Sequence, residues 1–276
     1  MKQMKRKGNW FMRFPILPAF AVPFLSILGM SILLDIIVSV IIINKPDLMR
    51  IGEEISKITS SILRIMIAFL IILIMKLGTK GRFKFGFNRK NIKLSFILAS
   101  FSVLMIADNI IEGFVFTNGL QTTAIGFFVA IIGGIAPGFF EEVVCRGLVL
   151  SNMMDKWQTK KNYVLKSVLM SGIAFGVIHL INLGCADMWV TILQVFYAAG
   201  VGIFFGAVYV RTRNLWGPVA MHALIDIAYY LFIWPEGFHL NELISGICIT
   251  VVFTVIGLYL IRPQKQEEIV ELWEEK

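Results

Sequence analysis

Eight long apolar runs restrict the folds that this sequence can adopt. Each holds roughly 20 or more residues, the length that a helix needs to cross about 30 Å of hydrocarbon. Inside a bilayer the backbone must satisfy its own hydrogen bonds, and a helix does so within one segment. The sequence therefore predicts an all-α, polytopic integral membrane protein with about eight transmembrane helices, near residues 16–43, 58–76, 92–115, 122–154, 163–183, 189–210, 215–234 and 243–261.

Composition and charge support this class. Hydrophobic residues make up 57% of the 276 residues and charged residues 16%, which excludes a soluble domain of ordinary composition. Basic residues accumulate on the cytoplasmic side of membrane proteins. Here they gather in alternate connections, which predicts cytoplasmic N- and C-termini and leaves Arg64 inside the second run. The second connection alone carries Lys76, Lys80, Arg82, Lys84, Arg89, Lys90 and Lys93.

The net charge of +8 is explained by this topology and by attraction to anionic lipid headgroups. We therefore expect the lipid bilayer as a partner and no nucleic acid. The Lys- and Ile-rich composition indicates a bacterial protein, and hence the bacterial plasma membrane. Cys145, Cys185 and Cys248 lack C-x-x-C spacing, so neither a disulfide nor a zinc cluster is expected.

A single transmembrane domain over residues 1–276 is expected, because no internal repeat is evident. Residues 264–276 predict a short, solvated cytoplasmic tail. Gly202 and Gly206 have the small-xxx-small spacing that allows helices to approach closely, so we predict a packing role for both.

The fourth run is longer than one membrane crossing needs. Gly133, Gly134 and Pro137 lie within it and favour a break or a kink. A re-entrant half-helix is therefore an alternative to a single long helix in this run.

Ionisable side chains lie inside three of the runs, and such residues mark a functional site by default. Glu142 and Arg146 are i,i+4 neighbours on a helix, so we predict a buried ion pair between them. Neighbouring residues point about 100° apart, so Glu141 and Glu142 should not both face one site. Glu141 is then the carboxylate expected to point into an interior cavity. The alternative is a purely structural ion pair with a spare acid.

His179 lies in the fifth run, and His222 and Asp226 are i,i+4 neighbours in the seventh. Asp226 is expected to accept a proton from one imidazole nitrogen of His222 and so fix which nitrogen faces the site. Taken alone, each histidine also fits a structural role. Together with the two glutamates, these residues are typical of a hydrolase that activates water. His239 is expected at the surface.

Three motifs, in this order along the chain, resemble the motifs of a known family. The segments EEVVCR at 141–146, FGVIH at 175–179 and HALID at 222–226 resemble the EExxxR, FxxxH and HxxxN/D motifs of the CPBP family, the CAAX-protease and bacteriocin-processing intramembrane peptidases. The segment RTRNLWGP at 211–218 is similar to that family's usual lead-in to the last motif. The resemblance covers roughly 125–235, which we expect to be the catalytic core.

The resemblance implies an intramembrane endopeptidase with Glu141, Glu142, His179, His222 and Asp226 at its site. Two chemistries fit. In one, Glu141, His179 and His222 bind a divalent metal, with zinc as the expected ion, which activates water. In the other, Glu141 is itself the general base, no metal is needed, and His222 with residue 226 stabilises the oxyanion by hydrogen bonding. An ionised aspartate offers no hydrogen-bond donor, so Asp226 favours the metal chemistry.

Other motifs exclude some mechanisms but leave the substrate open. No HExxH and no GxSxG pattern is present, so a zincin and a serine nucleophile are disfavoured. The expected substrate is a membrane-associated peptide or protein, such as a CAAX tail, a pheromone or a bacteriocin leader. The alternatives are a non-catalytic immunity or scaffold protein of the same fold and a proton-coupled transporter.

Overall fold

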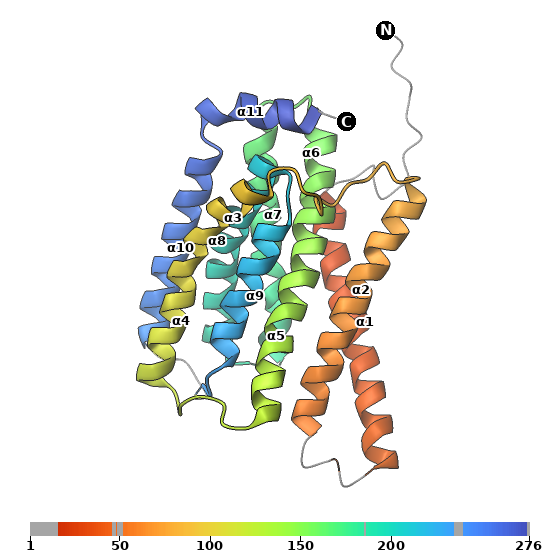
Figure 1. The fold of residues 1–276 in the computed structure, drawn as a ribbon, viewed down its shortest axis with the longest axis vertical. Coiled ribbons are helices and arrows are strands. Elements are labelled where there is room, and N and C mark those ends of the chain that lie inside the picture. The colour runs from red at the N-terminus through yellow and green to blue at the C-terminus, as the bar shows by residue number, and fades with distance from the viewer. Residues whose placement is uncertain (1–15, 46–47, 49–51, 185, 235–239, 275–276) are drawn as a thin grey trace.

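The protein is a bundle of long helices (Figure 1). The computed structural model describes residues 16–45, 48, 52–184, 186–234 and 240–274; His239, Cys185 and the basic N-terminal residues lie outside these ranges. Within them the β-structure is one isolated bridge between Leu120 and Phe232. The α-helices are α1 Ile16–Asn44, α2 Gly52–Gly78, α3 Ile92–Ala99, α4 Val103–Phe116, α5 Ala124–Glu142, α6 Ser151–Trp157, α7 Tyr163–Ile178, α8 Met188–Thr212, α9 Trp216–Tyr230, α10 Leu240–Leu260 and α11 Pro263–Glu274.

Most of the predicted spans are present as helices that can cross a membrane. The all-α, polytopic membrane fold is thereby confirmed. The last run before α10 forms α9, whose 15 residues rise only about 22 Å. In the described part of the chain, seven helical segments are long and apolar enough to span a bilayer: Ala21–Asn44, Gly52–Gly78, Ile92–Phe116, Ala124–Trp157, Tyr163–Gly184, Met188–Thr212 and Leu240–Leu260.

The fourth run is one continuous helical segment of 34 residues, Ala124–Trp157. Pro137 lies inside α5 without ending it, so the alternative of a re-entrant half-helix is wrong. The irregularity lies further along, where Val143–Leu150 form a π-helix directly after Glu142. Helices of this kind are rare and often occur at functional sites.

Helix α8 forms the centre of the bundle, and most of its second half is buried. It packs against α7 and α10, while α5 packs against α9 and α2. Figure 1 shows α1 and α2 as a pair at one side of the bundle. The ionisable residues of the three motifs lie on α5 and the segment that follows it, directly after the end of α7, and on α9.

Two glycines bring the backbones of α5 and α9 into direct contact. A Cβ at Gly138 would lie 2.7 Å from the backbone nitrogen of Ala223, and one at Gly134 would lie 2.5 Å from that of Ile227. Such distances are too short for any larger side chain, so only glycine allows this approach. The contact ends one turn before Glu141 and places it beside the α9 residues around His222.

A second close approach joins α7 and α8. A Cβ at Gly202 would lie 2.9 Å from the Cα of Gly172, which confirms the predicted packing role of Gly202. A Cβ at Gly206 would meet only the side chains of Leu150 and Val168, at 3.4 and 3.5 Å. The tight contact therefore depends on the first glycine of the pair.

The C-terminal residues form α11, which lies across the end of the bundle (Figure 1). Ile269 is fully buried, and Trp273, on the same helix face, donates from Nε1 to the carbonyl oxygen of Val210 at 2.9 Å. Arg211 also pairs with Glu268 at 2.8 Å. The expectation of a merely solvated tail is therefore wrong, because the apolar face of this segment docks on the end of α8.

Candidate active site

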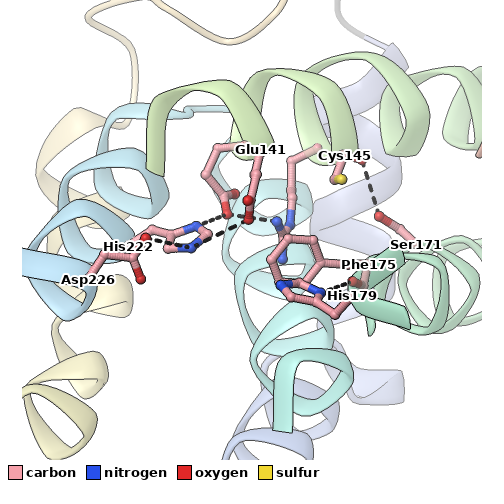
Figure 2. A network of polar contacts seen from close by, with 9 residues as sticks. Glu141, Cys145, Ser171, Phe175, His179, His222 and Asp226 are labelled. Carbon is pink, nitrogen blue, oxygen red and sulfur yellow. Dashed lines mark hydrogen bonds and ion pairs between the residues drawn. The ribbon is translucent and has the colours of Figure 1, made fainter. Parts of the chain in front are cut away.

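An interior cavity of about 530 Å³ brings together side chains from α5, α7 and α9. Its walls include Glu141, His179, His222 and Asp226, four of the residues that the sequence singles out. The other two, Glu142 and Arg146, are fully buried beside this wall. Figure 2 shows how the site residues converge from three separate helices.

Glu142 and Arg146 form a buried ion pair. Nη1 of Arg146 donates to Oε1 of Glu142 at 2.7 Å, and neither side chain is exposed. Among the described residues, the remaining guanidinium nitrogens of Arg146 have no hydrogen-bond acceptor. The guanidinium carbon instead lies 4.2 Å from the centre of the Phe175 ring, a cation–π contact that offsets part of the cost of burial.

Glu142 also orients the imidazole of His222. Nδ1 of His222 lies 2.9 Å from Oε1 of Glu142. An ionised carboxylate can only accept a hydrogen bond, so Nδ1 carries a proton and donates it. Asp226 Oδ2 lies 3.7 Å from Nε2, beyond hydrogen-bond distance. The prediction that Asp226 fixes this histidine is therefore wrong, because the close contact of α5 and α9 places Glu142 nearer to the ring.

Glu141 approaches the opposite edge of the same ring. Its Oε2 lies 3.8 Å from Nε2 of His222, and its side chain is 16% exposed, toward the cavity. Both glutamates therefore meet His222, although the helix geometry predicts that they should not face one site. The reason is that the two carboxylates approach different nitrogens of the ring, Glu142 at Nδ1 and Glu141 at Nε2.

The aromatic residues of the site hold the two histidines in place. Phe175 makes edge-on contacts with His179 at 5.0 Å and with His222 at 5.9 Å between ring centres. Phe205 stacks on His222 at 5.8 Å. Nδ1 of His179 lies 2.7 Å from the carbonyl oxygen of Phe175, which can only accept, so this nitrogen is a donor as well. In both histidines, Nε2 is thus the nitrogen left for chemistry.

The positions of these side chains can be compared with the coordination that a metal ion requires. Zinc requires three or four nitrogen, oxygen or sulfur ligands at about 2.0–2.3 Å. Within the described residues, no three His, Cys, Asp or Glu side chains are arranged to hold a metal ion. Glu141, His179 and His222 are therefore not assembled as a ligand set in this arrangement. The zinc site stays a prediction.

Comparison with known protein families gives a match in the middle of the chain. Residues 121–228 match the family described as type II CAAX prenyl endopeptidase Rce1-like. These residues are thus similar to the Rce1-like type II CAAX prenyl endopeptidases. The matched segment contains all six residues described above, from Glu141 to Asp226, and the match agrees with the resemblance found in the sequence. No curated protein and no solved structure matches the chain.

The cavity beside the Rce1-like motifs has further polar residues that the sequence reasoning did not select. Carboxylates of Asp108, Glu112 and Glu242 line it, as does the guanidinium of Arg64 on α2. The sequence does contain a signal for most of these residues, because ionisable residues inside apolar runs are functional candidates by default. The sequence could not show that α2, α4 and α10 contribute to the same cavity as the three motifs.

Proposed function

We propose that the protein is an intramembrane endopeptidase in which Glu141 activates water to cleave a peptide bond of a membrane-associated peptide or protein. The observation that carries this proposal is the position of Glu141 on the wall of an interior cavity, beside His222 and His179. The family match supports proteolysis as the type of activity.

The two glutamates have different roles in this proposal. Glu142 is held by Arg146 at 2.7 Å and by His222 at 2.9 Å, so its carboxylate is already engaged. Glu141 makes neither of these contacts and borders the cavity. A general base must be free to accept a proton from the attacking water. Glu141 is therefore the base, and Glu142 positions His222.

The reaction proceeds in two steps. The carboxylate of Glu141 takes a proton from water while the water oxygen bonds to the carbonyl carbon of the substrate, and the carbonyl π electrons move onto its oxygen. The resulting tetrahedral intermediate then collapses. The C–N bond breaks, and the proton held by Glu141 passes to the leaving nitrogen, which restores the carboxylate. One water is consumed, and the products are a carboxylic acid and an amine.

The substrate class follows from the location of the cavity. A cavity inside a bundle of membrane-spanning helices favours a peptide that is itself held in or at the bilayer. A CAAX-type tail, a peptide pheromone and a bacteriocin leader all belong to this class. The bilayer would concentrate such a substrate next to the enzyme and deliver it at the depth of Glu141.

The proposal is tested with purified protein in lipid nanodiscs and a library of membrane-tethered, fluorescently labelled peptides. Wild-type protein should cleave a subset of the library. Glu141→Gln should lower the rate by about 10²–10⁴-fold, because it removes the base and little volume. Glu267→Gln, on the exposed face of α11, is the matched control and should cleave normally.

Two results would contradict the proposal. Turnover that survives Glu141→Gln would refute Glu141 as the base. Wild-type protein that binds a peptide from the library without cleaving it would instead support a scaffold or immunity protein of this fold. In both cases the melting temperature of each variant shows whether the fold is intact.

A further inference from the structure

Arg64 is a cation near the middle of a membrane-spanning helix. It lies twelve residues after the start of α2 at Gly52, a rise of about 18 Å, and it is partly buried. No carboxylate of the described residues lies within 4.0 Å of its guanidinium. A charged side chain at this depth is costly and marks a functional position by default.

The surroundings of Arg64 connect it to the proposed active site. It lines the same cavity as Glu141 and Asp226. Asp226 in turn lies 3.7 Å from His222. Arg64 therefore shares the wall of this cavity with Glu141, His222 and Asp226.

The carboxylates of the cavity wall disfavour additional negative charge in the cavity. In the part of the chain that the structure describes, its walls carry one arginine, and their five carboxylates are Asp108, Glu112, Glu141, Asp226 and Glu242. Attack of water on a peptide carbonyl places a full negative charge on the carbonyl oxygen. That charge would be repelled by the carboxylates and needs a cation or strong donor beside it.

Several other polar groups on the cavity wall are poorly suited to stabilise an oxyanion. An ionised Asp226 has no proton to donate, and in a neutral His222 whose Nδ1 donates to Glu142, Nε2 is an acceptor. The amide nitrogens of Asn109 and Asn182 donate to Ile225 and Gln194. Arg64, in contrast, has its five N–H groups free of hydrogen bonds to the described residues.

We propose that Arg64 is a catalytic residue that stabilises the oxyanion formed on the substrate carbonyl during hydrolysis. This inference rests on the proposed protease function. Arg64 gains and loses no proton in the step: its N–H groups bind the carbonyl oxygen as the water oxygen bonds to carbon, and they release it when the C–N bond breaks. A charge-assisted bond of this kind strengthens as the negative charge develops, which is the requirement for lowering the barrier.

The first test compares Arg64→Met with Lys57→Met, which removes a charge from the exposed face of the same helix. Arg64→Met should lower kcat by about 10²–10³-fold and leave KM nearly unchanged, because the interaction forms only in the transition state. Lys57→Met should cleave as wild type does. A rise in KM with unchanged kcat would overturn the inference and indicate ground-state binding of a substrate carboxylate.

The second test does not depend on turnover. A peptide phosphinate, an anionic tetrahedral mimic of the intermediate, should bind wild-type protein and lose about 100-fold or more in affinity with Arg64→Met. If Arg64→Met does not fold, Arg64→Lys serves in its place and should retain an intermediate affinity. Equal phosphinate binding by the folded variant and wild type would overturn the inference.

The two proposals fail in different ways. A wild type that cleaves peptide while Arg64→Met is equally active refutes the role of Arg64 alone. A wild type that neither cleaves peptide nor binds the phosphinate refutes the protease function, and the role of Arg64 falls with it.

Discussion

Replacement of Arg146 by methionine should be among the most destabilising single changes in this protein. The side chain is unexposed and pairs with Glu142 at 2.7 Å. Coulomb's law gives about 6 kcal/mol for two unit charges at this distance with an effective dielectric constant of 20. Desolvation offsets part of this attraction, but removal of one partner leaves a buried charge uncompensated, at about 3–5 kcal/mol. We therefore expect Arg146→Met to lower the free energy of unfolding by about 3–5 kcal/mol.

The measurement is a thermodynamic cycle in mixed detergent micelles, with unfolding followed by SDS titration. Glu142→Gln added to Arg146→Met should restore about 2 kcal/mol or more, because no unpaired charge remains and the amide oxygen can still accept from His222. Arg82→Met, at an exposed position, is the control and should unfold as wild type does. Additive effects of the two site substitutions, or an Arg146→Met protein of wild-type stability, would refute the argument that this ion pair is energetically coupled.

Three further predictions follow from packing and chemistry. Gly138→Ala should lower the free energy of unfolding by about 1–3 kcal/mol and reduce cleavage, because its Cβ would lie 2.7 Å from the backbone of Ala223. The control is Gly78→Ala, whose Cβ meets no atom within 4 Å and which should leave both unchanged. SDS unfolding measures the stability and the cleavage assay the activity. Ile269→Ala should cost about 2–5 kcal/mol through the cavity that it leaves under α11, compared with a much smaller loss for partly buried Val270→Ala in the same unfolding assay. Cleavage should persist after dialysis against a chelator if the glutamate mechanism holds, and activity that is lost and then restored by added zinc would contradict that mechanism.

Much of the fold could be predicted from local sequence. The apolar runs predict the helices because membrane crossing depends on length and hydrophobicity, both of which are read directly from the chain. The i,i+4 spacing also predicts the contact of Glu142 with Arg146, since both lie on one helix. The boundary of α9 is harder, because its 15 residues are held by packing in the interior as well as by hydrophobicity.

The parts of the site that depend on contacts between helices could not be predicted. The sequence assigns the orientation of His222 to Asp226 on its own helix, whereas the structure assigns it to Glu142 on α5, at 2.9 Å. That choice depends on how closely α5 and α9 approach, which is a tertiary property. For the same reason the sequence shows Arg64 only as a basic residue inside an apolar run, whereas the structure places it on the cavity wall.

The glycine contact between α5 and α9 also limits how the molecule can admit a peptide. Because the two backbones touch at Gly134 and Gly138, neither helix can slide or tilt away without breaking that contact. The acid on one helix and the imidazole on the other therefore move as one rigid unit. Any widening that lets a peptide chain reach them must come from the walls on the other sides of the cavity, formed by α1, α2, α4, α7, α8 and α10.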